Sequence, residues 1–208
     1  WRKAKDKKEK SGNMVRLEIM RKFGYYVTES SEHNAEYMPY WIKKSYPKLV
    51  AEYNIPLDEY PRRCVNQIAG WKRQYKEICE NPSLSHTRSH EYGSGIMEAI
   101  VTDVPFQIGG NVLNHGFITN LPADAVVEVP CLVDSNGVQG TYVGALPVQC
   151  AALNMTNINV HLAAIEAALT RKREHVYHAA MLDPHTSAEL SLDDIVAMCD
   201  ALIEEHGD

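Results

Sequence analysis

The sequence has 208 residues, 45% of them hydrophobic, and a formal net charge of −6. This content suffices for a globular core, but no run approaches the roughly 20 apolar residues of a membrane span, and no signal peptide is recognisable. The acidic balance disfavours nucleic acid as a partner, and five scattered cysteines without CxxC spacing are typical of reduced thiols in a cytoplasmic protein.

The first ten residues form a charged lead-in with six basic and two acidic side chains. The chain begins at Trp1, without a methionine and in the middle of a charged helical pattern. We therefore expect a fragment of a longer protein.

The N-terminal half has mainly helical patterns. Apolar spacing predicts a helix over residues 11–23, with Gly24 as its C-terminal stop signal. Residues 23–37, FGYYVTESSEHNAEY, are rich in tyrosine, acid, amide and hydroxyl groups and predict a loop that leads into a helix over residues 35–44. Two more helices are predicted over residues 60–79 and 85–101.

The second half begins with extended segments. Residues 105–116 and 125–134 are β-branched and predict strands, and Ser135-Asn-Gly predicts a tight turn before another short strand. Helices follow over residues 147–169, around 177–182, and after Ser191. Because helices, a few strands and helices follow one another without βαβ alternation, we predict an α+β fold in a single domain, residues 1–208.

Two polar segments are candidate sites, and each also has a structural interpretation. In the 23–37 segment, the acid and hydroxyl groups could form a helix N-cap with its solvated first turn, while Tyr25 and Tyr26 could be core aromatics. In QIGGNVLNHG, glycines permit close approach of a ligand, and Asn111, Asn114 and His115 offer hydrogen bonds. Such asparagine-rich turns are also commonly structural.

Histidine pairs offer little support for a metal site. His86 and His90 have the i, i+4 spacing of zinc ligands on a helix, but the pattern supplies no third ligand. His175 and His178 lie among charged residues. We interpret both pairs as solvated helix surface and predict no metal ligands in this chain.

Four long segments carry a resemblance to a known family. They include RKFGYYVTESSEHNAEYMPYWIKK, NVLNHGFITNLPADAVVEVPCLVD and VGALPVQCAALNMTNI, followed by residues 166–207. Together they resemble the C-terminal half of family 4 glycoside hydrolases, in the α-galactosidase (melibiase) branch.

The resemblance implies a fold like the C-terminal domain of lactate and malate dehydrogenases, with helices packed on a small, largely antiparallel sheet. It implies an NAD-binding Rossmann domain upstream, absent from this chain, and a divalent metal such as Mn²⁺ whose principal ligands also lie outside. The implied reaction is hydrolysis of α-galactosides by oxidation at C3, elimination, water addition and reduction, an exception to two-carboxylate glycosidases.

The resemblance also implies residue roles. In some branches of this family a tyrosine removes the C2 proton, so Tyr25 or Tyr26 is the catalytic candidate, with an acid such as Glu29 as the alternative base. The candidates for binding the sugar are Glu29, Ser30, His33, Asn111, Asn114 and His115.

Partners follow from the same resemblance. We expect a sugar substrate, a homo-oligomer, and no nucleic acid or membrane. An α-glucosidase or α-glucuronidase of the same family is an alternative, as is a non-catalytic assembly domain, and the fragment alone is expected to be inactive.

Overall fold

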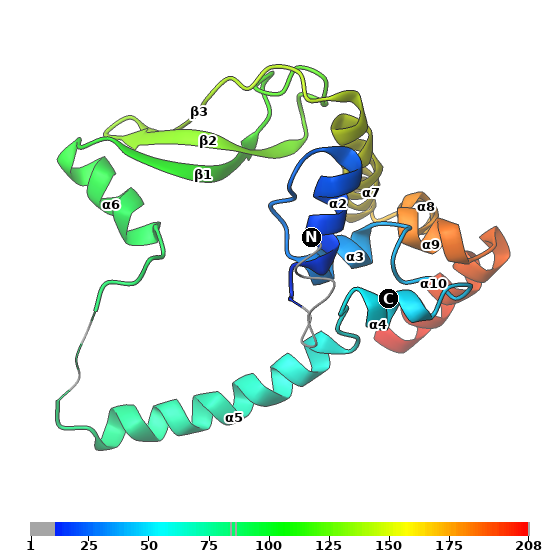
Figure 1. Ribbon diagram of the computed structural model, residues 1–208, viewed down its shortest axis with the longest axis horizontal. Coiled ribbons are helices and arrows are strands. Elements are labelled where there is room, and N and C mark those ends of the chain that lie inside the picture. Colours follow the sequence, from blue (N-terminus) through cyan, green and yellow to red (C-terminus); the bar gives the residue numbers. More distant parts are fainter. Residues whose placement is uncertain (1–10, 84, 86, 208) are drawn as a thin grey trace. The chain divides into compact units, whose positions relative to one another are not determined.

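The computed structural model describes residues 11–83, 85 and 87–207, in which helices, a small sheet and further helices follow one another (Figure 1). The predicted α+β class is confirmed. The elements are α2 (Met14–Phe23), α3 (Ser31–Tyr37), α4 (Lys48–Glu52), α5 (Glu59–Glu80), α6 (Gly93–Thr102), β1 (Phe106–Leu113), β2 (Val126–Asp134), β3 (Gly137–Gly140), α7 (Val148–Thr170), α8 (Arg173–Leu182), α9 (Pro184–Glu189) and α10 (Leu192–His206).

Helix α2 ends where its sequence predicts. Gly24 has φ 87°, a left-handed conformation that favours glycine, and its N–H donates to the Met20 carbonyl at 2.9 Å. The buried face of α2 packs against α3. The cluster formed there consists of Val15, Ile19, Ala35, Met38, Trp41 and Ile55.

The predicted helix over residues 35–44 is wrong in position, because α3 begins and ends earlier. The Ser30 hydroxyl accepts a hydrogen bond from the His33 N–H at 3.3 Å and so starts the helix at Ser31. Pro39 disfavours helical backbone at the preceding residue, and Met38 is extended with φ −115° and ψ 147°.

Two other helices differ from prediction. The helix predicted over residues 85–101 starts only at Gly93. Upstream, the Ser89 hydroxyl accepts the Glu91 N–H at 3.3 Å, a local turn that competes with helix formation. Helix α9 was not predicted, although Asp183 caps it and Pro184 occupies its first turn.

The sheet has the order β1-β2-β3, with β2 in the middle, and is antiparallel. Burial alternates along β2, with Val127, Val129 and Cys131 buried and the residues between them exposed. Gly110 of β1 lies against Cys131, since a Cβ at this glycine would meet the Cys131 Sγ at 2.8 Å. Close packing between neighbouring strands therefore requires glycine there.

The C-terminal helices form a packed group in which α7 contacts α8, and α8 contacts α9 and α10. Ser191 and Asp194 form the predicted start of α10 as a reciprocal capping box. The Lys43 Nζ lies 2.7 Å from a Glu189 carboxylate oxygen of α9, and this bond lowers the pKa of Glu189. The ion pair ties the segment after α3 to α9.

The described residues divide into two compact units. One contains those up to Ile55, Gln107–Leu132 and those from Val138 onward, and the other contains those of Pro56–Phe106 and Val133–Gly137. The single domain expected from the sequence stays a prediction. No helix in the described ranges combines the length and apolar character that crossing a membrane requires.

Candidate substrate site

The loop between α2 and α3 contains the two candidate tyrosines. Gly24 ends one helix and Ser30 caps the next, so the residues between them are left outside regular structure. Tyr25 is 54% exposed and Tyr26 is 47% exposed. Neither is a core aromatic, and both rings are accessible to a ligand.

The two tyrosines differ in their contacts. The Tyr26 ring lies beneath the Arg16 guanidinium, whose carbon is 4.4 Å from the ring centroid, and the Tyr26 hydroxyl donates to the Asn13 Oδ1 at 3.4 Å. The Tyr25 hydroxyl makes no hydrogen bond to any other described residue. Tyr25 therefore has the hydroxyl that is free to meet a ligand.

The other predicted residues of this segment have local partners. Glu29 Oε1 accepts the Ser30 N–H at 2.7 Å, and the Ser30 hydroxyl caps α3. His33 Nδ1 lies 2.9 Å from a Glu36 carboxylate oxygen, and its ring stacks on Tyr37 with 6.0 Å between centroids. The helix-cap interpretation therefore holds for Ser30, while sugar binding by Glu29, Ser30 and His33 stays a prediction.

The His33–Glu36 contact predicts a pH effect. The hydrogen bond that protonated His33 donates to the Glu36 carboxylate raises the pKa of His33 above its ordinary value. The contact therefore adds stability below the unfolded-state pKa, and this stability is lost as pH rises through the folded-state pKa. We expect Glu36→Gln to lower the His33 pKa in an NMR titration, with the exposed His206 as internal control. An unchanged His33 pKa would refute this assignment.

The NVLNHG segment separates into three environments. Asn111 is on the exposed face of β1, and His115 is exposed in a turn with φ 42°. Asn114 is fully buried, and its amide nitrogen donates to the Ile118, Leu121 and Pro122 carbonyls at 2.9, 3.1 and 2.9 Å. Its Oδ1 accepts the Ile118 N–H at 2.8 Å. This geometry favours a structural role for Asn114, whereas Asn111 and His115 remain available to a ligand.

An open cavity of about 520 Å³ is lined by residues from both predicted segments, although none of the predicted site residues themselves lies on it. Thr28 comes from the tyrosine loop, and Gln107, Gly109 and Glu128 come from the exposed faces of β1 and β2. Asn111 follows Gly109 by two positions and so shares its face of β1. Ile108, Val129 and Pro130 complete the lining.

The chemistry of this cavity suits a polyhydroxylated ligand. A carboxylate, an amide and a hydroxyl offer both donors and acceptors, and Gly109 leaves room for close approach. A side chain at position 109 would contact Glu128, because its Cβ would lie 3.4 Å from the Glu128 Oε1. Sequence reasoning missed Thr28, Gln107 and Glu128, although the alternating pattern of β2 places Glu128 on the solvent face.

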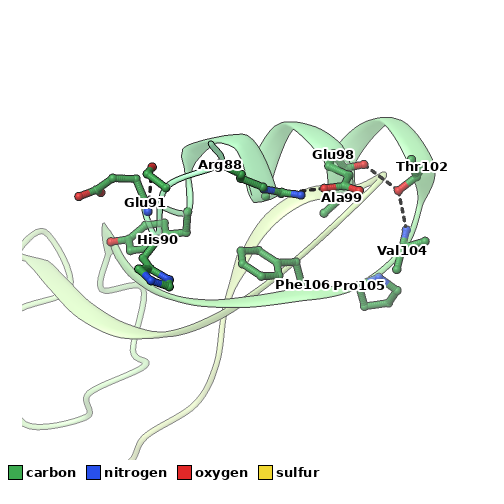
Figure 2. Close-up of a pocket in the computed structure, with 12 residues that line it drawn as sticks. Arg88, His90, Glu91, Glu98, Ala99, Thr102, Val104, Pro105 and Phe106 are labelled. Carbon is green, nitrogen blue, oxygen red and sulfur yellow. Dashed lines mark hydrogen bonds and ion pairs between the residues drawn. The ribbon is translucent and has the colours of Figure 1, made fainter. Parts of the chain in front are cut away.

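A second cavity of about 500 Å³ lies between α6 and the segment that leads into β1 (Figure 2). Arg88 lies on it, with an Nη 2.7 Å from a Glu98 carboxylate oxygen and Nε 3.3 Å from the Ser94 hydroxyl. The positive charge of Arg88 is thus paired with the Glu98 carboxylate. None of the predicted site residues lines this cavity.

Metal ligands are not assembled in the part of the chain that the structure describes, where no group of three His, Cys, Asp or Glu side chains could hold an ion. His86 lies outside the described residues, so the His86–His90 pair is not placed, and the predicted helical position of His90 is wrong because α6 begins only at Gly93. The His175 and His178 rings are 5.9 Å apart between centroids on α8.

Comparison with known proteins identifies the family. Residues 1–186 match the C-terminal domain of family 4 glycosyl hydrolases. The chain is 62% identical to an α-galactosidase of Bacillus subtilis over 208 residues, which is all of this chain and 48% of that protein. It is 30% identical to an α-galactosidase of Rhizobium meliloti over 200 residues, 91% of this chain and 40% of that protein. The fold and these matches define a glycoside hydrolase domain.

The chain belongs to family 4 of the glycosyl hydrolases and contains its C-terminal domain. It spans about half the length or less of these curated relatives, 48% of one and 40% of the other.

Solved structures agree on the fold. The Bacillus subtilis protein lplD, named a glucosidase, superposes with a TM-score of 0.81 at 22% identity, covering 95% of this chain and 44% of that one. A 6-phospho-α-glucosidase from gut microorganisms, crystallised with NAD and Mn²⁺, superposes with a TM-score of 0.67 at 18% identity, covering 91% of this chain and 42% of that one. The predicted α+β fold with helices and a small antiparallel sheet is thereby confirmed.

Proposed function

We propose that this chain is the substrate-side half of an α-galactosidase that hydrolyses α-galactosides by oxidation at C3, elimination, water addition and reduction. The observation that carries the proposal is 62% identity to an α-galactosidase along the entire chain. The match to an α-glucosidase of Erwinia rhapontici, 36% identity over 89 residues, covers only 42% of the chain. This difference favours galactosides over the α-glucoside alternative.

The proposed cofactors are NAD and a divalent metal such as Mn²⁺, which would supply the hydride chemistry and polarise the sugar. The described residues fit neither, because they contain no cluster of three metal-ligating side chains and no glycine-rich GxGxxG segment. We therefore propose that both are held by residues outside the described part of the chain.

This chain's own contribution is proposed to be proton transfer and sugar binding. Oxidation of C3 to a ketone acidifies the neighbouring C2 proton, and the Tyr25 hydroxyl, as phenolate, would accept that proton as the C1 bond to the aglycone breaks. Its exposure and its lack of a partner among the described residues support Tyr25 over Tyr26. Glu128, Gln107 and Thr28 would bind sugar hydroxyls in the cavity between the loop and the sheet.

A homo-oligomer is part of the proposal. Helix α5 buries none of its side chains and exposes a stripe that includes Tyr60, Ile68, Trp71 and Tyr75 at helical spacing. Contiguous apolar surface of this kind is uncommon on monomeric proteins and marks interaction sites.

The test of the proposed function uses the full-length protein with NAD⁺, Mn²⁺ and aryl glycosides of three sugars. We expect hydrolysis of the α-galactoside to exceed that of the α-glucoside and the α-glucuronide. In D₂O, the released galactose should contain deuterium at C2, because the C2 proton is removed and replaced during turnover. Hydrolysis without deuterium at C2 would show a displacement reaction and refute the mechanism.

The 208-residue chain alone should show no measurable hydrolysis of the same aryl α-galactoside, even with NAD⁺ and Mn²⁺. The reason is that its described residues assemble no metal-binding cluster. A parallel assay of the full-length protein is the control. Robust turnover by the isolated chain would show that it is a complete catalyst and overturn the assignment as half of an enzyme.

A further inference from the structure

Arg16 of α2 reaches across to the tyrosine loop and holds its backbone. The Arg16 Nε donates to the Val27 carbonyl at 2.9 Å, and one terminal nitrogen donates to the Thr28 carbonyl at 3.1 Å. These two carbonyls belong to the residues that follow the tyrosine pair. The guanidinium therefore fixes two successive peptide groups of the loop.

The rest of the Arg16 guanidinium fixes the Tyr26 side chain. The guanidinium carbon lies 4.4 Å from the Tyr26 ring centroid, and the other terminal nitrogen donates to the Asn13 Oδ1 at 3.3 Å. The same Asn13 oxygen accepts the Tyr26 hydroxyl at 3.4 Å. All three nitrogens of one guanidinium are thus used to hold the loop and its anchor Asn13.

The backbone of Arg16 anchors the far end of the same segment. Its N–H donates to the hydroxyl of Ser31, a buried residue at the start of α3, at 3.3 Å. Contacts of one residue therefore extend from Tyr26 to Ser31. A lysine could supply the charge, but not the planar fork that bonds two carbonyls while stacking on a ring.

We propose that Arg16 is a positioning residue for the reaction, acting through Tyr25. With Val27, Thr28 and the Tyr26 ring held, the backbone on the C-terminal side of Tyr25 is fixed, so the exposed Tyr25 side chain projects from an anchored segment whose Thr28 lines the cavity. A displacement of about 1 Å at a reacting group can cost about 100-fold in rate. This inference rests on the proposed function, but its structural half is testable separately.

The main experiment is Arg16→Lys in the full-length protein, assayed with an aryl α-galactoside, NAD⁺ and Mn²⁺. We expect kcat to fall by roughly 10- to 100-fold, with smaller changes in KM for the galactoside and for NAD⁺. The matched control is Arg21→Lys on the same helix, where the arginine pairs with Glu18. This control should retain the wild-type kcat.

A double mutant separates positioning from simple structural support. If Arg16 acts through Tyr25, Arg16→Lys should add little to the loss caused by Tyr25→Phe. In Arg16→Ala, added guanidinium at low concentration should restore part of kcat, whereas ethylammonium should not. The inference would be overturned if the losses of kcat in the two single mutants were additive in the double mutant. It would also be overturned if Arg16→Lys kept the wild-type kcat while Tyr25→Phe was defective. Either outcome would leave the proposed function intact.

Hydrogen–deuterium exchange supplies a readout without catalysis. Arg16→Lys should speed exchange in residues 25–29, while Arg21→Lys leaves that loop at the wild-type rate. If the wild-type enzyme does not hydrolyse α-galactosides, both the proposed function and the catalytic role of Arg16 fail. The exchange data then decide by themselves whether Arg16 anchors the loop. Unchanged exchange in Arg16→Lys would refute the anchoring itself.

Discussion

Tyr25→Phe in the full-length protein is expected to lower kcat by roughly 10²- to 10⁴-fold, the usual cost of removing a positioned base. The substitution keeps the ring and removes only the hydroxyl, which has no hydrogen-bond partner among the described residues. Because Tyr25 is 54% exposed, the thermal stability should hardly change. NAD⁺ affinity should also be unaffected, so the loss will lie in the chemical step.

Tyr26→Phe is the matched control for this prediction. It keeps the ring under Arg16 and loses only the 3.4 Å hydrogen bond to Asn13, so kcat should fall much less than in Tyr25→Phe. A large loss in Tyr26→Phe alone would transfer the role of base to that residue. If both variants kept near-wild-type kcat and a C2-deuterated substrate still gave its isotope effect, another residue, such as Glu29, would be the base.

Asn114→Ala is expected to destabilise the protein more than it impairs the chemistry. The truncation would leave the Ile118 N–H and several backbone carbonyls around the buried amide without their partner. Each unsatisfied buried group costs about 1–3 kcal/mol. For a domain of this size, that predicts a fall in Tm of about 5 °C or more in thermal unfolding, because each kcal/mol shifts Tm by about 2–4 °C.

The neighbours Asn111 and His115 provide the comparison. Both are exposed, so their alanine variants should keep the wild-type Tm, and any loss in kcat/KM would indicate contact with the sugar. An Asn114→Ala variant with unchanged Tm and reduced kcat/KM would contradict the structural role and restore Asn114 to the predicted sugar site. Tm and kcat/KM measured on the same three variants therefore separate the two roles.

Much of the local structure was determined by sequence alone. The end of α2 at Gly24, the start of α10 at Ser191 and the strands around the Ser135-Asn-Gly turn are specified by residues close together in the chain. Residues in caps and turns form hydrogen bonds with backbone groups that are close in the sequence, so caps and turns can be predicted without knowledge of the fold. The same holds for the family resemblance, which the match of residues 1–186 confirms.

The candidate site, in contrast, was decided by tertiary structure. Only the fold places Thr28 of the loop beside Gly109 and Glu128 of the sheet, and only burial distinguishes Asn114 from Asn111, although the two asparagines look alike in sequence. The physical reason is that local signals describe what a residue bonds to nearby, whereas a cavity depends on pairings between distant segments. The role of Arg16 likewise depends on tertiary structure, because its guanidinium donates hydrogen bonds to backbone carbonyls 11 and 12 residues away in the sequence.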